Sequence, residues 1–295
     1  MSDRDTLTIN ELEQPTAVLE EIKTEASASK EKLTLLLNLF FVKSKSILFA
    51  GVGLLVFCGL WSLLSVYTQN ALPTPIATLT VLKEMLSDPF YDYGPNDKGI
   101  GLQLFQSIKT VLSGFLLGSL IAIPIGILMG ASTICKQIFY PIVQLLKPVS
   151  PLAWFPIGLV VFKDTGMATI FIVFITSLWS TLINTSFGVA SIPQDHKNVA
   201  KAFGFSKWRY LTKILIPYSL PHIITGLRLS ISVAWLVIVA GEMLSGGAGI
   251  GFFVWDSWNA LSLEKVISAI IIIGIVGLLF DRIFTFFENK VAYKA

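Results

Sequence analysis

Six polar and aromatic residues in apolar parts of the chain have the side-chain types that can bind a small anion. They are Lys147, Ser150, Trp154, Phe155, Thr181 and Asn184. A lysine attracts negative charge, and hydroxyl and amide groups replace part of an anion's hydration shell. Ionisable groups inside a membrane usually serve a function, although a lysine near its edge can instead extend to the surface. The two aromatic residues are equally compatible with core packing.

Two further charged residues in apolar segments, Arg228 and Glu242, are less suited to this role. We expect Arg228 to make a contact between helices or to reach the membrane surface, because an unpaired charge in a bilayer is costly. A carboxylate would repel an anion, so we expect Glu242 to cap a helix or to form part of an outer gate.

The sequence lacks the motifs of common catalytic and nucleotide-binding sites. A phosphate-binding loop G-x-x-x-x-G-K-[ST] is excluded because the dipeptide Gly-Lys never occurs. The glycines of residues 246–251 follow an apolar segment, so we interpret them as an outer turn. His196 and His222 are interpreted as surface or docking residues, and Cys58 and Cys135 lie in different segments, which disfavours a metal site. We therefore expect neither an enzyme nor a bound cofactor.

The composition is that of a polytopic membrane protein. Of the 295 residues, 54% are hydrophobic and 14% are charged, and the mean hydropathy is +0.72. Soluble domains carry about 25% charged residues. Apolar segments predict six spans, at about residues 47–66, 106–129, 138–162, 167–189, 223–243 and 266–287. The expected fold is all-α, with a polar tail and interfacial segment over residues 1–46 and a transmembrane domain over residues 47–295.

Two spans carry patterns that should shape their helices. The third should be broken, as is tolerated where backbone lines a cavity or is buried in protein, because it contains Pro141, Pro148, Pro151 and Pro156. The second should pack closely against another helix of the same chain, because small residues recur at every fourth position, namely Gly114, Gly118, Ala122, Gly126 and Gly130. Pro124 is a possible kink, and we place Lys136 in a short inner loop.

The distribution of basic residues predicts that both ends of the chain are cytoplasmic. Lys43 and Lys45 precede the first span, Lys290 and Lys294 follow the last, and the outer loops hold few lysines. The acidic residues 1–32 do not resemble a signal peptide, and residues 33–42 are too short to span a bilayer.

The longest basic run is NVAKAFGFSKWRYLTKILIP, residues 198–217. Its apolar residues recur at close to a helical period, Gly204 permits a bend, and Pro217 is expected to end the segment. An apolar face with a tryptophan and surrounding lysines suits a short helix at the cytoplasmic membrane surface. On charge alone, the run would also fit an ordinary membrane-proximal loop.

This run resembles the signature loop of ABC-importer permeases, over residues 191–218. That pattern is Glu-Ala-Ala, three residues, Gly, nine residues, Ile, one residue and Leu-Pro, and the spacing from glycine to proline is matched here. Asn198 and Val199 stand where the pattern has Glu and its first Ala. In that family the segment is a coupling helix that docks on the ATPase subunit. The coupling residues implied here are Asn198, Val199, Ala200, Phe203, Gly204, Ile214 and Pro217.

Nearly all of residues 70–287 resembles the nitrate/sulfonate/bicarbonate branch of these permeases, most of all the nitrate type. The resemblance lies in residues 88–101, 144–163, 191–206 and 226–259. It implies a homodimer in the bacterial inner membrane, docked on ATPase subunits that use ATP and Mg²⁺, with a separate substrate-binding protein and no nucleic acid. The expected substrate is nitrate or nitrite, with bicarbonate and cyanate as alternatives. The alternative of another class is a secondary anion transporter or channel, which would need no ATPase.

Overall fold

The computed structural model of the protein describes residue 45 and residues 48–94 and 97–291. The predictions for the acidic tail, residues 33–42, the boundary at 46/47 and the lysines at 43 and 294 fall outside the described residues. Within them, the regular elements are helices, apart from one isolated bridge between Asp92 and Lys98. The predicted all-α class is confirmed.

The chain divides into two compact units, and the boundary along the sequence falls between Pro75 and Ile76. The first contains the helix Leu48–Tyr67, which is long and apolar enough to span a membrane. The turn after this helix is held by its own side chains: Trp61 Nε1 donates to the Pro73 carbonyl at 2.9 Å, and Ser65 Oγ donates to the Leu72 carbonyl at 2.7 Å.

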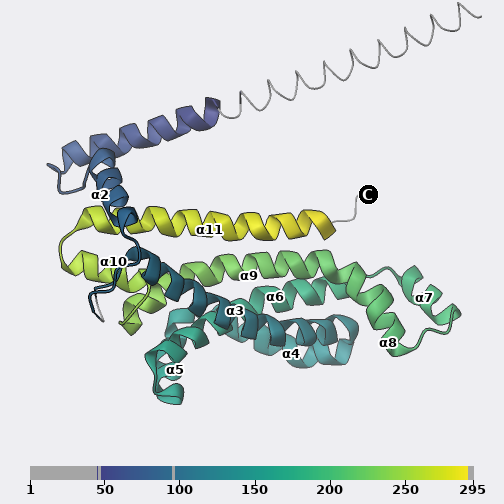
Figure 1. Cartoon of the computed structure of the whole chain (residues 1–295). Coiled ribbons are helices and arrows are strands. Elements are labelled where there is room, and N and C mark those ends of the chain that lie inside the picture. The colour runs from purple at the N-terminus through teal and green to yellow at the C-terminus, as the bar shows by residue number, and fades with distance from the viewer. Residues whose placement is uncertain (1–44, 46–47, 95–96, 292–295) are drawn as a thin grey trace, which may run out of the picture. The chain divides into compact units, whose positions relative to one another are not determined.

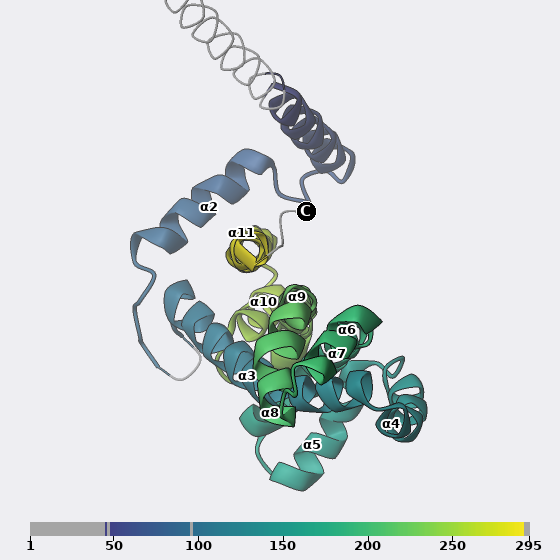
Figure 2. The same cartoon turned by 90° about the vertical axis from the view of Figure 1, so that its right-hand side faces the viewer.

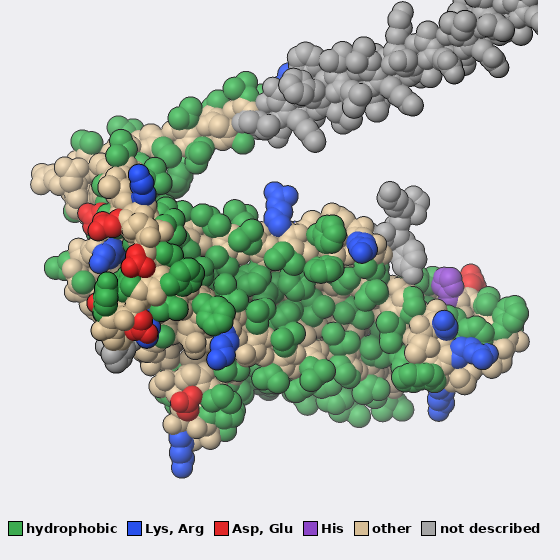
Figure 3. Space-filling model, viewed as in Figure 1, with side chains coloured by type: hydrophobic (Ala, Val, Ile, Leu, Met, Phe, Trp, Pro, Cys, Tyr) green, Lys and Arg blue, Asp and Glu red, His purple; other side chains and the backbone are tan. Residues whose placement is uncertain are grey.

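The second unit holds the other candidate spans. Its elements are α2 (Pro75–Ser87), α3 (Ile100–Ala131), α4 (Thr133–Leu146), η1 (Pro151–Trp154), α5 (Phe155–Phe162), α6 (Thr165–Ala190), α7 (Gln194–Ala202), α8 (Lys207–Tyr210), η2 (Leu211–Leu215), α9 (Ile216–Ser245), α10 (Ile250–Asn259) and α11 (Leu263–Val291). Over both units, the described residues form five helices able to cross a membrane, or six if α4 and η1–α5 count as one broken span. This agrees with the six predicted spans. Hydrophobic side chains cover most of the face of the second unit that Figure 3 shows.

Helix α6 lies at the centre of the second unit, between α3 and α9. Figures 1 and 2 show α11 on one side of these helices and α4 on the other, with α7 and α8 beyond one end and α10 at the opposite end. Helices α3 and α6 run in the same direction, whereas α9 runs antiparallel to α6, because its segment returns from the turn that holds α7 and α8.

The ladder of small residues on α3 forms the seam with α6, as predicted. A Cβ atom at Gly114 would meet the Val173 side chain at 2.6 Å, and one at Gly126 would lie 2.7 Å from Thr185 Cβ. Glycines such as Gly188 also allow close approach between α6 and α9. Such close backbone approach is how helices associate in lipid, where burial of apolar groups gives no driving force between helices. Helix α3 continues through Pro124 without interruption.

The predicted break in the third span is confirmed, but it lies at one place only. Helices α4 and η1–α5 are bent by 97°, and the break falls after Leu146. Pro141 lies inside α4 and does not interrupt it. The placement of Lys136 in a loop is wrong: α4 already begins at Thr133, because the Ser132 side chain caps it by accepting a bond from the Cys135 N–H at 3.4 Å.

The prediction that Pro217 ends the basic segment is also wrong. Helix continues from Lys207 to Ser245 through α8, η2 and α9. Proline has no N–H and crowds the preceding turn, which usually breaks a helix. Here η2 is a π-helical turn directly before Pro217, in which the Ile216 N–H bonds the Leu211 carbonyl. The wider turn lets the helix pass the proline.

The α3–α6 seam generates a stability prediction. Gly126→Ala should lower the free energy of unfolding by about 1–3 kcal/mol, because the new methyl group overlaps Thr185 and the Leu182 carbonyl. Thermal unfolding of the purified chain in detergent measures this. The control is Gly274→Ala on α11, where a Cβ atom meets nothing within 4 Å, and it should leave stability unchanged or raise it. Equal melting temperatures for the two variants would contradict the tight seam.

Candidate functional site

The basic segment is a helix–turn–helix unit rather than one short helix. After α7, Gly204 turns the chain with φ +61°, a conformation that favours glycine. The second helix begins at Lys207, and the Ser206 side chain caps it by accepting from the Arg209 N–H at 3.3 Å. Figure 3 shows the basic side chains gathered at this tip of the molecule.

The implied coupling residues divide into an exposed and an anchoring set. Val199 and Phe203 are 51% and 74% exposed, and a Cβ atom at Gly204 would meet nothing within 4 Å. Ala200 is buried, on the inner side of α7. An exposed aliphatic and aromatic pair one helical turn apart is the kind of surface that another protein covers.

The remaining coupling residues lie elsewhere in the unit. Asn198 is exposed, and its Oδ1 accepts from Gln194 Nε2 at 3.4 Å on the same helix. Ile214 lies in η2 and packs beside the buried Val189, Ile192 and Leu215. This small cluster ties the base of the second helix to the end of α6, so it holds the unit at a fixed place on the bundle.

Three of the predicted pathway residues lie along the bend of the broken span. Lys147 occupies the C-cap position of α4. Ser150 occupies the N-cap position of η1, and Trp154 is the last residue of η1. Lys147 and Ser150 are exposed. The Trp154 indole N–H is buried and has no hydrogen-bond partner among the described residues. The bend thus places a cation, a hydroxyl group and an indole donor within eight residues.

Lys147 also lines a cavity that sequence reasoning missed. The cavity has a volume of about 280 Å³ between α4 and α6, and Lys136, Tyr140 and Gln144 line it as well. These residues follow one another at spacings of four, four and three, so they share one face of α4. That spacing is visible in the sequence, but it marks one helix face only if the helix includes Lys136, as α4 does.

The other three predicted pathway residues lie inside the bundle. Phe155 is buried against Ala168 and Ile172, so it serves as core packing. Thr181 is fully buried, and its Oγ1 lies 2.7 Å from Ser230 Oγ on α9. The Asn184 amide donates to the Ser180 carbonyl of its own helix at 2.8 Å. In this conformation the hydroxyl of Thr181 faces a neighbouring helix and not an open route.

Arg228 makes the contact between helices that was expected of it. Its Nε lies 2.7 Å from Asp281 Oδ1, and its Nη1 lies 2.8 Å from Glu288 Oε2. Both carboxylates belong to α11, and Thr225 also donates to Glu288 at 2.6 Å. Arg228 is thus committed to the α9–α11 contact.

Glu242 caps a helix, which was one of the two roles expected for it. Its Oε2 accepts from the Gly251 N–H at 2.9 Å and from Ser107 Oγ at 2.7 Å, and the side chain is 3% exposed. Gln103 accepts from the Gly249 N–H at 2.6 Å. A carboxylate is favourable at a helix N-terminus. This cluster fixes α10 to α3 at the end opposite α7.

Comparison with known proteins identifies the family. The family of binding-protein-dependent transport system inner membrane components matches residues 122–293, which is more than half of the chain. The chain belongs to this family. It is therefore a multi-pass, non-catalytic membrane subunit of an ABC importer, and the alternative of a self-sufficient secondary transporter or channel is set aside.

Relatives of two kinds are similar over most of the chain. The nitrate import permease protein NrtB of Synechocystis sp. is 40% identical over 253 residues, which cover 86% of this chain and 92% of that protein. The bicarbonate transport system permease protein CmpB of Synechococcus elongatus is 42% identical over 243 residues, which cover 81% and 87%. NrtB of Leptolyngbya laminosa is 42% identical, with coverage of 82% and 86%.

Solved structures show the same fold at low sequence identity. An inward-facing structure of the MetNI methionine ABC transporter has a chain with TM-score 0.58 and 14% identity, matching 65% of this chain and 95% of that one. An amino acid ABC transporter crystallised with histidines gives TM-score 0.54 at 16% identity, matching 64% and 92%. The predicted permease fold is confirmed.

Proposed function

We propose that this subunit imports a small inorganic anion into the cytoplasm, with nitrate as the leading substrate. The relatives named for nitrate and for bicarbonate support a small oxyanion as the substrate. The two kinds of relative are almost equally similar to this chain. Bicarbonate is therefore the second candidate. The observation that carries an anionic substrate is the cavity in which Lys136 and Lys147 lie together.

The bend at Lys147–Trp154 is the proposed place where the anion passes. Lysines attract the anion, while the hydroxyl of Ser150 and the unpaired indole N–H of Trp154 are donors that replace its hydration water. A discontinuous helix suits such a site, because its broken backbone offers further polar groups. We do not include Thr181 in this route, because its hydroxyl group is used between α6 and α9.

The energy for import is proposed to come from ATP and Mg²⁺ on a separate ATPase that docks on the exposed face of α7. Val199 and Phe203 supply the apolar contact, and Gly204 leaves room for close approach. We further propose a homodimer of this chain, both termini in the cytoplasm, and a binding protein that delivers substrate at the α10 end. The basic residues at the α7–α8 tip support this orientation, because cytoplasmic loops are enriched in lysine and arginine.

The choice of anion is tested by uptake in cells that lack this chain alone. Labelled nitrate, bicarbonate and cyanate are supplied separately at micromolar concentration. We expect nitrate uptake to be lost and to return when the wild-type chain is supplied. Loss of bicarbonate or cyanate uptake with nitrate uptake intact would retain the permease assignment and overturn nitrate as the substrate.

The cavity makes a prediction about Lys147. Lys147→Ala should reduce anion uptake at least ten-fold (about 1.4 kcal/mol), because it removes the positive charge at the bend. The matched control is Lys163→Ala, which removes an exposed lysine after α5 and should leave uptake unchanged. Binding to the ATPase, measured by co-purification, should be normal in both variants. Equal uptake by both would remove Lys147 from the pathway.

The exposed face of α7 makes a separate prediction. Phe203→Asp should abolish co-purification of the ATPase, because it places a charge on an apolar contact that is 74% exposed in this chain. Trp258→Asp is the control, because this aromatic residue is also exposed but lies in α10 at the opposite end. A Phe203→Asp chain that retains the ATPase at wild-type yield would show that docking occurs elsewhere.

A further inference from the structure

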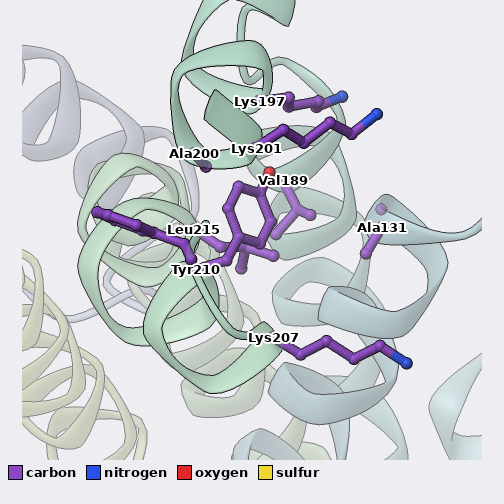
Figure 4. Close-up of a pocket in the computed structure, with 10 residues that line it drawn as sticks. Ala131, Val189, Lys197, Ala200, Lys201, Lys207, Tyr210 and Leu215 are labelled. Atoms are coloured by element: carbon purple, nitrogen blue, oxygen red, sulfur yellow. The ribbon is translucent and has the colours of Figure 1, made fainter. Parts of the chain in front are cut away.

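A second basic cavity lies at the helix–turn–helix unit of the basic segment, which is called the coupling unit below. It has a volume of about 340 Å³ and lies between the end of α3, α7 and the start of the second helix. Figure 4 shows Lys197 and Lys201 side by side on one wall and Lys207 on the other, with the Tyr210 ring between them. The described residues that line it include these three lysines and no carboxylate.

The positive charge of this cavity is not neutralised within the chain. Among the described residues, Lys197, Lys201 and Lys207 form no ion pair with an Asp or Glu. Like charges repel one another, so a cavity lined by three lysines and no carboxylate favours a bound anion. The lysines of α7 are one turn apart, so both face the cavity from one stripe of the helix.

The cavity faces away from the proposed ATPase contact. On an α-helix of 3.6 residues per turn, Val199 lies about 160° around the axis from both Lys197 and Lys201. Asp195 is four residues before Val199 and therefore shares the Val199 face. One side of α7 is thus available for a partner protein while the other side surrounds the cavity.

The level of the cavity indicates what kind of anion fits. Its wall includes Ala131, the last residue of α3, Val189 near the end of α6, and Leu215 directly before α9. The ends of membrane spans lie at the depth of the lipid headgroups, where basic cavities between helices bind phosphate-bearing headgroups.

We propose that this cavity binds a phosphate group, presented by an anionic membrane phospholipid. The three lysines act as point charges for the phosphate oxygens, and Val189 and Leu215 form an apolar floor on the side of the cavity where the apolar part of the lipid begins. A lipid held here contacts both helices of the coupling unit, so it would stiffen the unit against the bundle. The binding itself does not depend on which anion is transported.

The test measures lipid binding to the purified full-length chain by native mass spectrometry. Phosphatidylglycerol and the zwitterionic phosphatidylcholine are titrated separately, and inorganic phosphate is added as a competitor. Each of Lys197→Gln, Lys201→Gln and Lys207→Gln should weaken phosphatidylglycerol binding about five-fold, and the triple variant about 100-fold, with phosphatidylcholine unaffected. The triple Lys→Arg variant should restore binding, which separates loss of charge from misfolding.

The matched control removes the same charge elsewhere. Lys83→Gln, Lys163→Gln and Lys265→Gln together lower the net charge by three at exposed positions outside this cavity, and should leave binding at the wild-type level. Displacement by inorganic phosphate without any preference between the lipids would support a soluble phosphate as the source. Equal phosphatidylglycerol affinity in the wild-type chain and the cavity triple variant, or equal loss in both triple variants, would overturn the proposal.

Discussion

The close approach of α3, α6 and α9 is the constraint on which the rest of the second unit depends. Lipid tails are as apolar as the side chains they would replace, so these helices gain little from burial and must gain from contact between backbones. Glycines supply that contact on both sides of α6. Gly126 of α3 approaches α6 on one side, and Gly226 of α9 approaches it on the other. Once the three helices are in register, the α6–α9 connection must lie at one end and α10 at the other.

Polar contacts then fix the rotation of the helices. Ser230 Oγ donates to the Ser177 carbonyl at 2.7 Å, and Arg228 pairs with carboxylates of α11. Each bond is satisfied only when one face of α9 meets the correct neighbour, whereas the small-residue seam alone would allow several rotations. Glu242 fixes the end of the bundle opposite α7 in the same way, because its carboxylate accepts from both α3 and the first turn of α10.

Much of this architecture was predictable from local pattern. The span lengths, the broken third span and the glycine ladder depend on residues close in sequence, so periodicity and proline content revealed them. The errors at Lys136 and Pro217 arose where one capping side chain or one π-helical turn overrode a general rule. The role of Thr181 could not be predicted, because its partner Ser230 is distant in sequence. The acceptor of the Gly249 N–H was hidden for the same reason, because Gln103 is distant in sequence.

The exposure of the lysines in the proposed pathway suits transport rather than storage of an anion. A route must attract its ion and then release it, so binding along it has to be shallow. Lys136 and Lys147 are both exposed, and water around an ammonium group weakens its attraction for a nearby anion. Arg228, by contrast, is held by two carboxylates and offers no free charge to a passing anion. The proposed route thus uses cations that are exposed and unpaired, whereas the cation that holds helices together is paired with carboxylates.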